Sequence, residues 1–263
     1  MKRANREGFG ARGGSRVSFL GRSGSYGSAP AALLAGLAAL LVCGCESTQE
    51  KSAALERQAK HTKLAQHGVS VAKENPNVKV LSSAMVHSSE GTAVAVSVRN
   101  TSTHTLAGAP IELRVSDAKG NVLYQNNAPG LQSSLTELPL LEPGKTVVWV
   151  DDQVQAAGTP ASASALVGEG KTAPSIPKIE VTEARASTGG AEASESGSVV
   201  NRAAVLQANL VVYAVARRGG RTVAAGRAVL PEVAQGAKVP FQIYFVGNPR
   251  GAQIEVSAPA TTF

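Results

Sequence analysis

Reactive and metal-binding side chains are scarce in this chain of 263 residues, which has only two cysteines, four histidines and three aspartates. No serine lies in a GxSxG motif, and no glycine-rich loop has the order that cradles phosphate. His61 and His67 are six residues apart, a spacing that would put them on different faces of a predicted helix and is not a metal-ligand spacing. We therefore expect no catalytic activity, no metal site and no cofactor.

Aromatic residues are few as well, at 4% of the chain, and no basic stretch carries the interleaved aromatics that bind single-stranded nucleic acid. The net charge of +7 is concentrated at one end. Residues 1–44 have a net charge of +5, from six basic side chains and Glu7, so residues 45–263 have a net charge of only +2. Nucleic acid is therefore not an expected partner.

A long hydrophobic run is also missing. Ala31–Val42 has twelve residues without a polar side chain, which is short of the roughly 20 needed to cross a bilayer as a helix. It suits the apolar core of an export signal, and the basic residues 1–30 precede it as such a signal requires. Because both cysteines follow directly, the chain after them has no disulfide and no thiol nucleophile. An uncleaved anchor helix with two incidental cysteines is the alternative.

The end of this run has the order aliphatic, variable, glycine, cysteine, in Val42, Cys43, Gly44 and Cys45. It resembles the lipobox of bacterial lipoproteins. The resemblance implies a cleaved signal peptide over residues 1–44, recognised by its peptidase at Val42, Cys43 and Gly44. It also implies a lipid on Cys45, and so an exported protein anchored to the outer face of the cell membrane.

Residues 45–77 are rich in helix formers and predict a helix from about Thr48 to Gln66. Leu55, Ala59 and Val69 are its best candidates for a buried face, so the helix has little to bury. A solvated stalk between the lipid and the folded part is the favoured interpretation. The alternative is a helix that lies on the membrane or pairs with a protein, its basic side chains facing anionic headgroups: Lys51, Arg57, Lys60 and Lys63.

Apolar residues recur at every second position after residue 78, as in TAVAVSVRN (92–100) and PIELRVS (110–116). This period predicts strands with one buried face. Turn residues at 117–121 and at 141–144 follow, and the second turn leads into a strand that carries Trp149. The segment is therefore expected to be a β-sandwich.

The plan of this segment is repeated in residues 178–258. In each copy an asparagine precedes a turn glycine by about 20 residues, and a later glycine precedes an aromatic residue by five. The repeat makes Leu210–Val215 a strand rather than a buried helix. We expect a first domain at 78–170, a linker at 171–177 and a second domain at 178–263. The marker residues are Asn100, Gly120, Gly144 and Trp149 in one copy and Asn201, Gly220, Gly236 and Phe241 in the other.

Both copies resemble the FxLYD-type immunoglobulin-like domains of bacterial surface lipoproteins. The resemblance implies an all-β fold with two tandem Ig-like β-sandwich domains after the helical stalk, in the cell envelope and without a general catalytic activity. The matching segments are 98–100, 115–124 and 140–149 in the first copy and 199–201, 215–223 and 233–245 in the second.

The leading functional hypothesis is a lipid-anchored, non-catalytic binding or spacer module that meets another envelope protein or a wall polymer. The first copy has about eight extra residues in Asn126–Ser134, and such an insertion belongs in a surface loop. The predicted binding surface is formed by Asn126, Asn127 and Leu131, with Trp149 if it is exposed. Deletion of this loop is expected to leave the melting behaviour nearly intact.

Two other interpretations remain. A small-ligand carrier or envelope hydrolase would place Asp151, Asp152 and Glu137 in a concave pocket, and the two aspartates are also conceivable as a cation site. A signalling accessory that senses wall stress through the stalk has no marker in the sequence.

Overall fold

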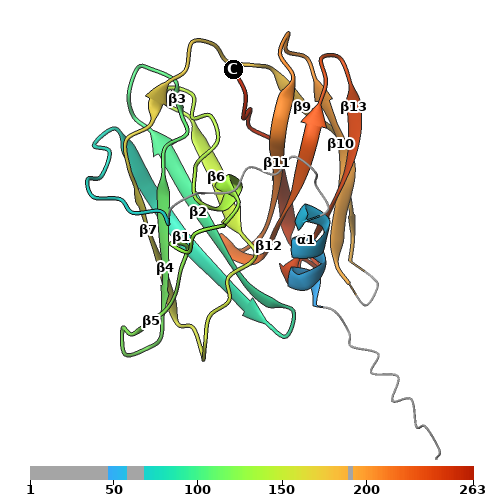
Figure 1. Ribbon diagram of the computed structural model, residues 1–263. Coiled ribbons are helices and arrows are strands. Elements are labelled where there is room, and N and C mark those ends of the chain that lie inside the picture. The colour runs from blue at the N-terminus through green and yellow to red at the C-terminus, as the bar shows by residue number, and fades with distance from the viewer. Residues whose placement is uncertain (1–46, 58–67, 189–191) are drawn as a thin grey trace, which may run out of the picture. The chain divides into compact units, whose positions relative to one another are not determined.

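Strands joined by tight turns make up most of the residues that the computed structural model describes, which are 47–57, 68–188 and 192–263. Figure 1 shows them as stacked sheets with one short helix at their edge. The predicted all-β class is confirmed for these residues. Their elements are α1 (Thr48–Arg57), β1 (Val78–Ser88), β2 (Gly91–Asn100), β3 (Leu106–Ala107), β4 (Ile111–Ser116), β5 (Val122–Gln125), the 3-10 helix η1 (Ser133–Leu135), β6 (Thr146–Asp151), β7 (Ser162–Val167), β8 (Lys171–Thr172), β9 (Ile179–Ser187), β10 (Ser194–Asn201), β11 (Gln207–Arg218), β12 (Arg221–Val233), β13 (Lys238–Tyr244), β14 (Val246–Gly247) and β15 (Gln253–Ser257).

The strands fall into two sets, which we call the first half (β1–β8) and the second half (β9–β15). The first half has sheets ordered β1-β2-β6 and β5-β4-β7, and the second has β9-β10-β13 and β14-β12-β11-β15. Apart from β14, the strand order of the second half repeats that of the first. Lys171 and Thr172, expected in a linker, form β8 and pair with β3.

The predicted turns lie where the sequence placed them. The Asp117 carboxylate accepts hydrogen bonds from the backbone N–H groups of Lys119 and Asn121, each at 2.8 Å. Gly120 has φ of 86°, a left-handed conformation that glycine adopts without steric cost, and β5 then begins at Val122. The dense apolar run at Leu210–Val215 is a strand, as expected, and lies within β11.

Asn100 and Asn201 make the same set of hydrogen bonds at the ends of β2 and β10. Each side-chain amide donates to two backbone carbonyls, those of His104 and Leu141 in one half and those of Val205 and Val233 in the other. Each backbone carbonyl also accepts a hydrogen bond of 2.9 Å from the glycine of the later turn, Gly144 N–H and Gly236 N–H. The repeated asparagine and glycine therefore mark equivalent positions in the two halves.

The two halves pack face to face. Along β11, Leu210, Val212 and Ala214 lie in the core of the second half, whereas Val211, Tyr213 and Val215 join the core of the first half. This central strand is consequently buried on both faces, and that explains why its sequence has no polar alternation. The described residues from Ser47 to Phe263 form one compact unit.

Gly247 shows how closely the halves approach each other. It has φ of 93° in β14, and a Cβ atom added there would lie 2.6 Å from Cγ1 of Val86 in β1 and 2.4 Å from the backbone oxygen of Val223. Both separations are far below van der Waals contact. A side chain at this position would push the two halves apart.

The helix α1 differs from the predicted stalk. Its buried side chains are Thr48, Ser52 and Glu56, which lie four residues apart on one face, while Leu55 is 50% exposed. The predicted apolar face was therefore wrong at Leu55, and α1 is docked on the sheets instead of being a solvated stalk. Ala59, Lys60 and the rest of the predicted helix lie outside the described residues. No helix among the described residues is long and apolar enough to span a membrane.

Candidate functional site

A fully buried arginine connects the helix to both halves. Arg227 in β12 is 0% exposed in its side chain. Its guanidinium donates hydrogen bonds to the Glu56 carboxylate at 2.8 Å, the Asp152 carboxylate at 3.2 Å and the Ser134 hydroxyl at 2.8 Å. A buried charge is stable only when it is paired and hydrogen-bonded, and Arg227 meets both conditions. We call Arg227, Glu56, Asp152 and Ser134 the polar centre.

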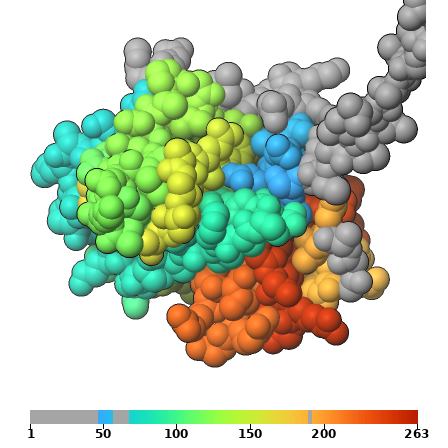
Figure 2. All heavy atoms as spheres, turned by 90° about the horizontal axis from the view of Figure 1, so that it is seen from below, coloured from blue at the N-terminus to red at the C-terminus, as the bar shows by residue number. Residues whose placement is uncertain are grey.

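The helix contributes to the polar centre through its buried polar face. The Ser52 hydroxyl donates to Asp152 at 2.9 Å, and the Thr48 hydroxyl donates to the backbone oxygen of Phe245 at 3.0 Å. Figure 2 shows α1 in blue beside yellow-green and teal segments of the first half. The polar centre is therefore where α1, the first half and the second half meet.

Burial makes the carboxyl groups at this centre easier to protonate. The pKa of Glu56 is raised from 4.5 to about 7, mainly by burial; the Arg227 guanidinium opposes this rise, and the nearby Asp152 and Asp151 carboxylates contribute to it. Burial likewise raises the pKa of Asp151 to about 6. The Tyr124 hydroxyl donates to Asp151 at 2.9 Å. These groups are enclosed by packing, so their protonation is linked to the stability of the fold.

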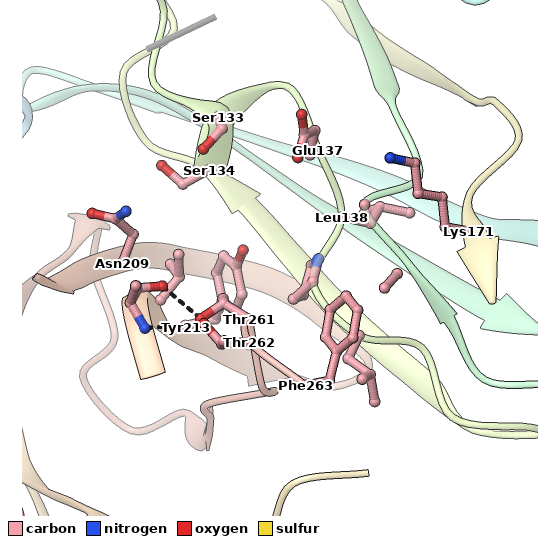
Figure 3. Close-up of a pocket in the computed structure, with 16 residues that line it drawn as sticks. Ser133, Ser134, Glu137, Leu138, Lys171, Asn209, Tyr213, Thr261, Thr262 and Phe263 are labelled. Atoms are coloured by element: carbon pink, nitrogen blue, oxygen red, sulfur yellow. Dashed lines mark hydrogen bonds between the residues drawn. The ribbon is translucent and has the colours of Figure 1, made fainter. Parts of the chain in front are cut away.

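A cavity of about 550 Å³ lies between the two halves, next to the polar centre. Its volume falls within the range of small-ligand pockets, roughly 300–1,000 Å³. One wall comes from the segment around η1 and from β3 and β8, and the other from β11 and the C-terminal segment (Figure 3). The first wall includes Ser133, Ser134, Glu137, Leu138 and Lys171, and the second includes Asn209, Val211, Tyr213, Thr261, Thr262 and Phe263.

Two side chains on the second wall carry polar groups. Among the described residues, Oδ1 of Asn209 is buried without a hydrogen-bond partner. The backbone of Asn209 is left-handed, with φ of 50°, a conformation that is uncommon outside glycine. The Tyr213 ring is buried, and its hydroxyl points into the cavity (Figure 3). Strained and unsatisfied polar groups gather at functional sites, so this wall is the candidate site.

The polar centre supports the first wall from behind. Ser134 lines the cavity and also accepts the hydrogen bond from Arg227. The Trp149 indole donates to the backbone oxygen of Ser134 at 3.0 Å, so two buried side chains fix this one residue. Sequence reasoning missed Arg227, although a lone charge in the apolar run VAAGRAVL was a usable signal.

The predicted lipidation site lies outside the described residues, as do Val42, Cys43 and Gly44. The first described residue, Ser47, comes two positions after Cys45. The Ser47 backbone N–H donates to the Glu50 carboxylate at 2.9 Å, as at the start of a capped helix. The described fold therefore begins within a few residues of the predicted lipid site.

The predicted binding surface needs correction at two residues. Asn126 and Trp149 are both 0% exposed. The Asn126 amide donates to the backbone oxygens of Ile111 and Leu135 and accepts from the Leu113 N–H, so it holds the loop to β4. Asn127 is exposed and Leu131 is half-buried. Only these two of the four residues are available at the surface.

The predicted tolerance to deletion of Asn126–Ser134 also needs correction. The tip at 127–130 is exposed, but both ends of the segment are anchored in the interior, by Asn126 and by Ser134. Removing the whole segment would take away the hydrogen bonds of Asn126 and leave Arg227 without one of its acceptors. We therefore expect the deletion to destabilise the fold.

The three carboxylates of the alternative hypothesis do not line one cavity among the described residues. Asp151 and Asp152 are 0% and 1% exposed and bind Tyr124 and Arg227 instead of facing a pocket. Glu137 alone lines the cavity. In the described part of the chain, no group of three or more His, Cys, Asp or Glu side chains is arranged to hold a metal ion.

Comparison with known protein families finds no match to this chain, and comparison with curated proteins finds no relative. The function therefore has to be argued from the sequence and from the geometry of the cavity and the polar centre.

Proposed function

We propose that this chain is a lipid-anchored protein of the bacterial cell envelope that acts as a non-catalytic binding or spacer module. The observation that carries the proposal is the apolar run Ala31–Val42, which ends in Cys43, Gly44 and Cys45. A run of this length fits a signal peptide better than a membrane span. A lipid on Cys45 would hold the folded part at the outer face of the cell membrane.

The binding module is, in this proposal, built from two Ig-like domains. Support comes from the shared strand order of the halves and from the equivalent hydrogen bonds of Asn100 and Asn201. The two halves pack face to face and have a cavity between them. This arrangement favours binding over spacing, because a spacer gains length only when its domains are placed end to end.

A non-catalytic role is supported by the use that the fold makes of its acidic groups. General acid or base catalysis needs a carboxyl group within hydrogen-bond reach of a substrate. Asp151 and Asp152 are instead enclosed and engaged with Tyr124, Arg227 and Ser52. Glu137 lines the cavity, but neither Asp151 nor Asp152 lines it with Glu137.

Metabolic labelling with a radioactive fatty acid tests the anchor. The full chain and its Cys43→Ala variant are expected to take up label, because Cys43 occupies the variable position before the glycine. The Cys45→Ala variant is expected to take up none. Label that persists in Cys45→Ala, or that is lost only in Cys43→Ala, would reject the proposed lipid site.

A further inference from the structure

We propose that the cavity between the two halves binds a saccharide, about one to three sugar rings long. This inference deepens the proposed binding function by naming a ligand class for it. Its basis is the number and placement of uncharged hydrogen-bonding groups on the two walls, together with an apolar surface between them. The cavity volume of about 550 Å³ is large enough for such a ligand.

The second wall supplies hydrogen-bonding groups to the cavity. Oδ1 of Asn209 is buried without a hydrogen-bond partner among the described residues, and the Tyr213 hydroxyl points into the cavity (Figure 3). A hydroxyl and an amide can both donate and accept, and they match the hydroxyl groups of a sugar, which do the same. A ligand hydroxyl at this wall can form a hydrogen bond with the Tyr213 hydroxyl.

The first wall adds a negative and a positive group. Glu137 and Lys171 both line the cavity, and no ion pair joins them to each other among the described residues. Together they contribute no net charge, so they favour neither an anionic nor a cationic ligand. A carboxylate accepts two hydrogen bonds side by side, as adjacent sugar hydroxyls can donate them. The Ser133 hydroxyl adds a further neutral group on the same wall.

Apolar side chains complete the surface. Leu138, Val211 and the Phe263 ring line the cavity, and Phe263 is 40% exposed (Figure 3). A pyranose ring has apolar C–H faces and polar edges, so it can cover these side chains while its hydroxyls reach both walls. Aromatic rings present a broad, rigid contact face at small entropic cost.

The second wall is held in place before any ligand arrives. The Thr261 hydroxyl donates to the backbone oxygen of Ala208 at 2.8 Å, and the Ala208 N–H donates to the Thr262 hydroxyl at 3.1 Å. The Gln207 amide donates to the backbone oxygen of Thr262 at 2.8 Å. The C-terminal segment is thereby fastened to β11, and a preformed wall reduces the entropic cost of binding.

Titration calorimetry on the full chain in detergent, with a panel of trisaccharides, tests the inference. The panel consists of homotrisaccharides of glucose, N-acetylglucosamine, galactose, mannose and rhamnose. At least one is expected to bind the wild type. Tyr213→Phe should weaken that binding about 5-fold, the loss expected for one neutral hydrogen bond. Tyr213→Phe removes only a hydroxyl that points into the cavity, so the fold is retained.

Tyr244→Phe is the matched control, because it removes the same hydroxyl from a tyrosine that does not line the cavity. It should bind the trisaccharide as the wild type does. Glu137→Gln keeps the size of the side chain and should weaken binding as well.

Three outcomes would overturn the inference. These are failure of every trisaccharide to bind the wild type, binding that Tyr213→Phe and Glu137→Gln leave unchanged, and displacement of the trisaccharide by the dipeptide alanylalanine. The last outcome would point to a zwitterionic peptide held by Glu137 and Lys171. None of them affects the fatty-acid labelling of Cys45, so failure of this inference is distinguishable from failure of the proposed anchor.

Discussion

Replacement of Arg227 by methionine should destabilise the fold more than replacement of any surface arginine. The guanidinium is fully enclosed and donates to Glu56, Asp152 and Ser134. Methionine fills a similar volume but leaves two buried carboxylates without their cation. Breaking a buried ion pair from one side costs about 3–5 kcal/mol in the free energy of unfolding.

Arg217→Met is the matched control for this prediction. Arg217 lies in the neighbouring strand β11 and pairs with Glu255, but their side chains are 32% and 58% exposed. Water screens such a pair, and its loss should cost about 0–1 kcal/mol. The two substitutions remove the same group, so the difference between them measures the effect of burial.

Urea unfolding followed by tryptophan fluorescence is a suitable assay. Trp149 is the single tryptophan of the chain, and its indole donates a hydrogen bond to Ser134. Ser134 also accepts a hydrogen bond from the Arg227 guanidinium, so the tryptophan is close to the substituted side chain. Adding Glu56→Gln to Arg227→Met should recover about 1 kcal/mol or more relative to the sum of the single changes. A loss below about 1 kcal/mol for Arg227→Met would refute the reasoning.

Three further predictions concern stability. Because burial raises the pKa of Glu56 from 4.5 to about 7, the folded protein keeps a proton on Glu56 that the unfolded chain releases. The contribution of Glu56 to the free energy of unfolding therefore falls as the pH rises through this interval. Urea midpoints at pH 5 and pH 7.5 should differ less in Glu56→Gln than in the wild type. Asn100→Ala and Asn201→Ala should each cost about 1–3 kcal/mol by thermal unfolding, and a negligible cost for one of them would contradict their equivalence. Asn126→Ala should cost about 2–3 kcal/mol in the free energy of unfolding, because it removes three buried hydrogen bonds. Asn127 is exposed, so Asn127→Ala should change stability by about 0.5 kcal/mol or less. Equal effects of the two substitutions would show that the loop is not anchored as described.

The strands and turns could be predicted because their signals are local. Alternation of apolar residues marked β2 and β4, and the Asp117 turn carries its own hydrogen-bonding groups. The repeated asparagine and glycine spacing also predicted that the second half would follow the plan of the first. These signals depend on residues within one strand or one turn, which a sequence displays directly.

The packing of the halves against each other could not be predicted in the same way. Ala93 and Ala95 in β2 are buried like Val94 and Val96, although the period-two interpretation assigned one solvated face to this strand. Small residues on the second face allow a close neighbour but do not identify it. The absence of polar residues on both faces of β11 was the clearest available signal.

The docking of α1 could not be predicted because the helix has no apolar stripe. Thr48, Ser52 and Glu56 have the spacing of a buried helical face, but polar residues are normally placed in solvent. The burial of Glu56 is explained by partners far away in the sequence: Gln153, and Arg227, which lies 171 residues further along the chain. Long-range pairing of this kind has no local signature.

Mass spectrometry of the N-terminal peptide of the mature protein, purified from membranes, tests the account most directly. The account predicts a peptide that begins at Cys45 and carries the added mass of a diacylglycerol group. A peptide that extends into residues 1–44, or one that begins at Cys45 without lipid, would contradict it.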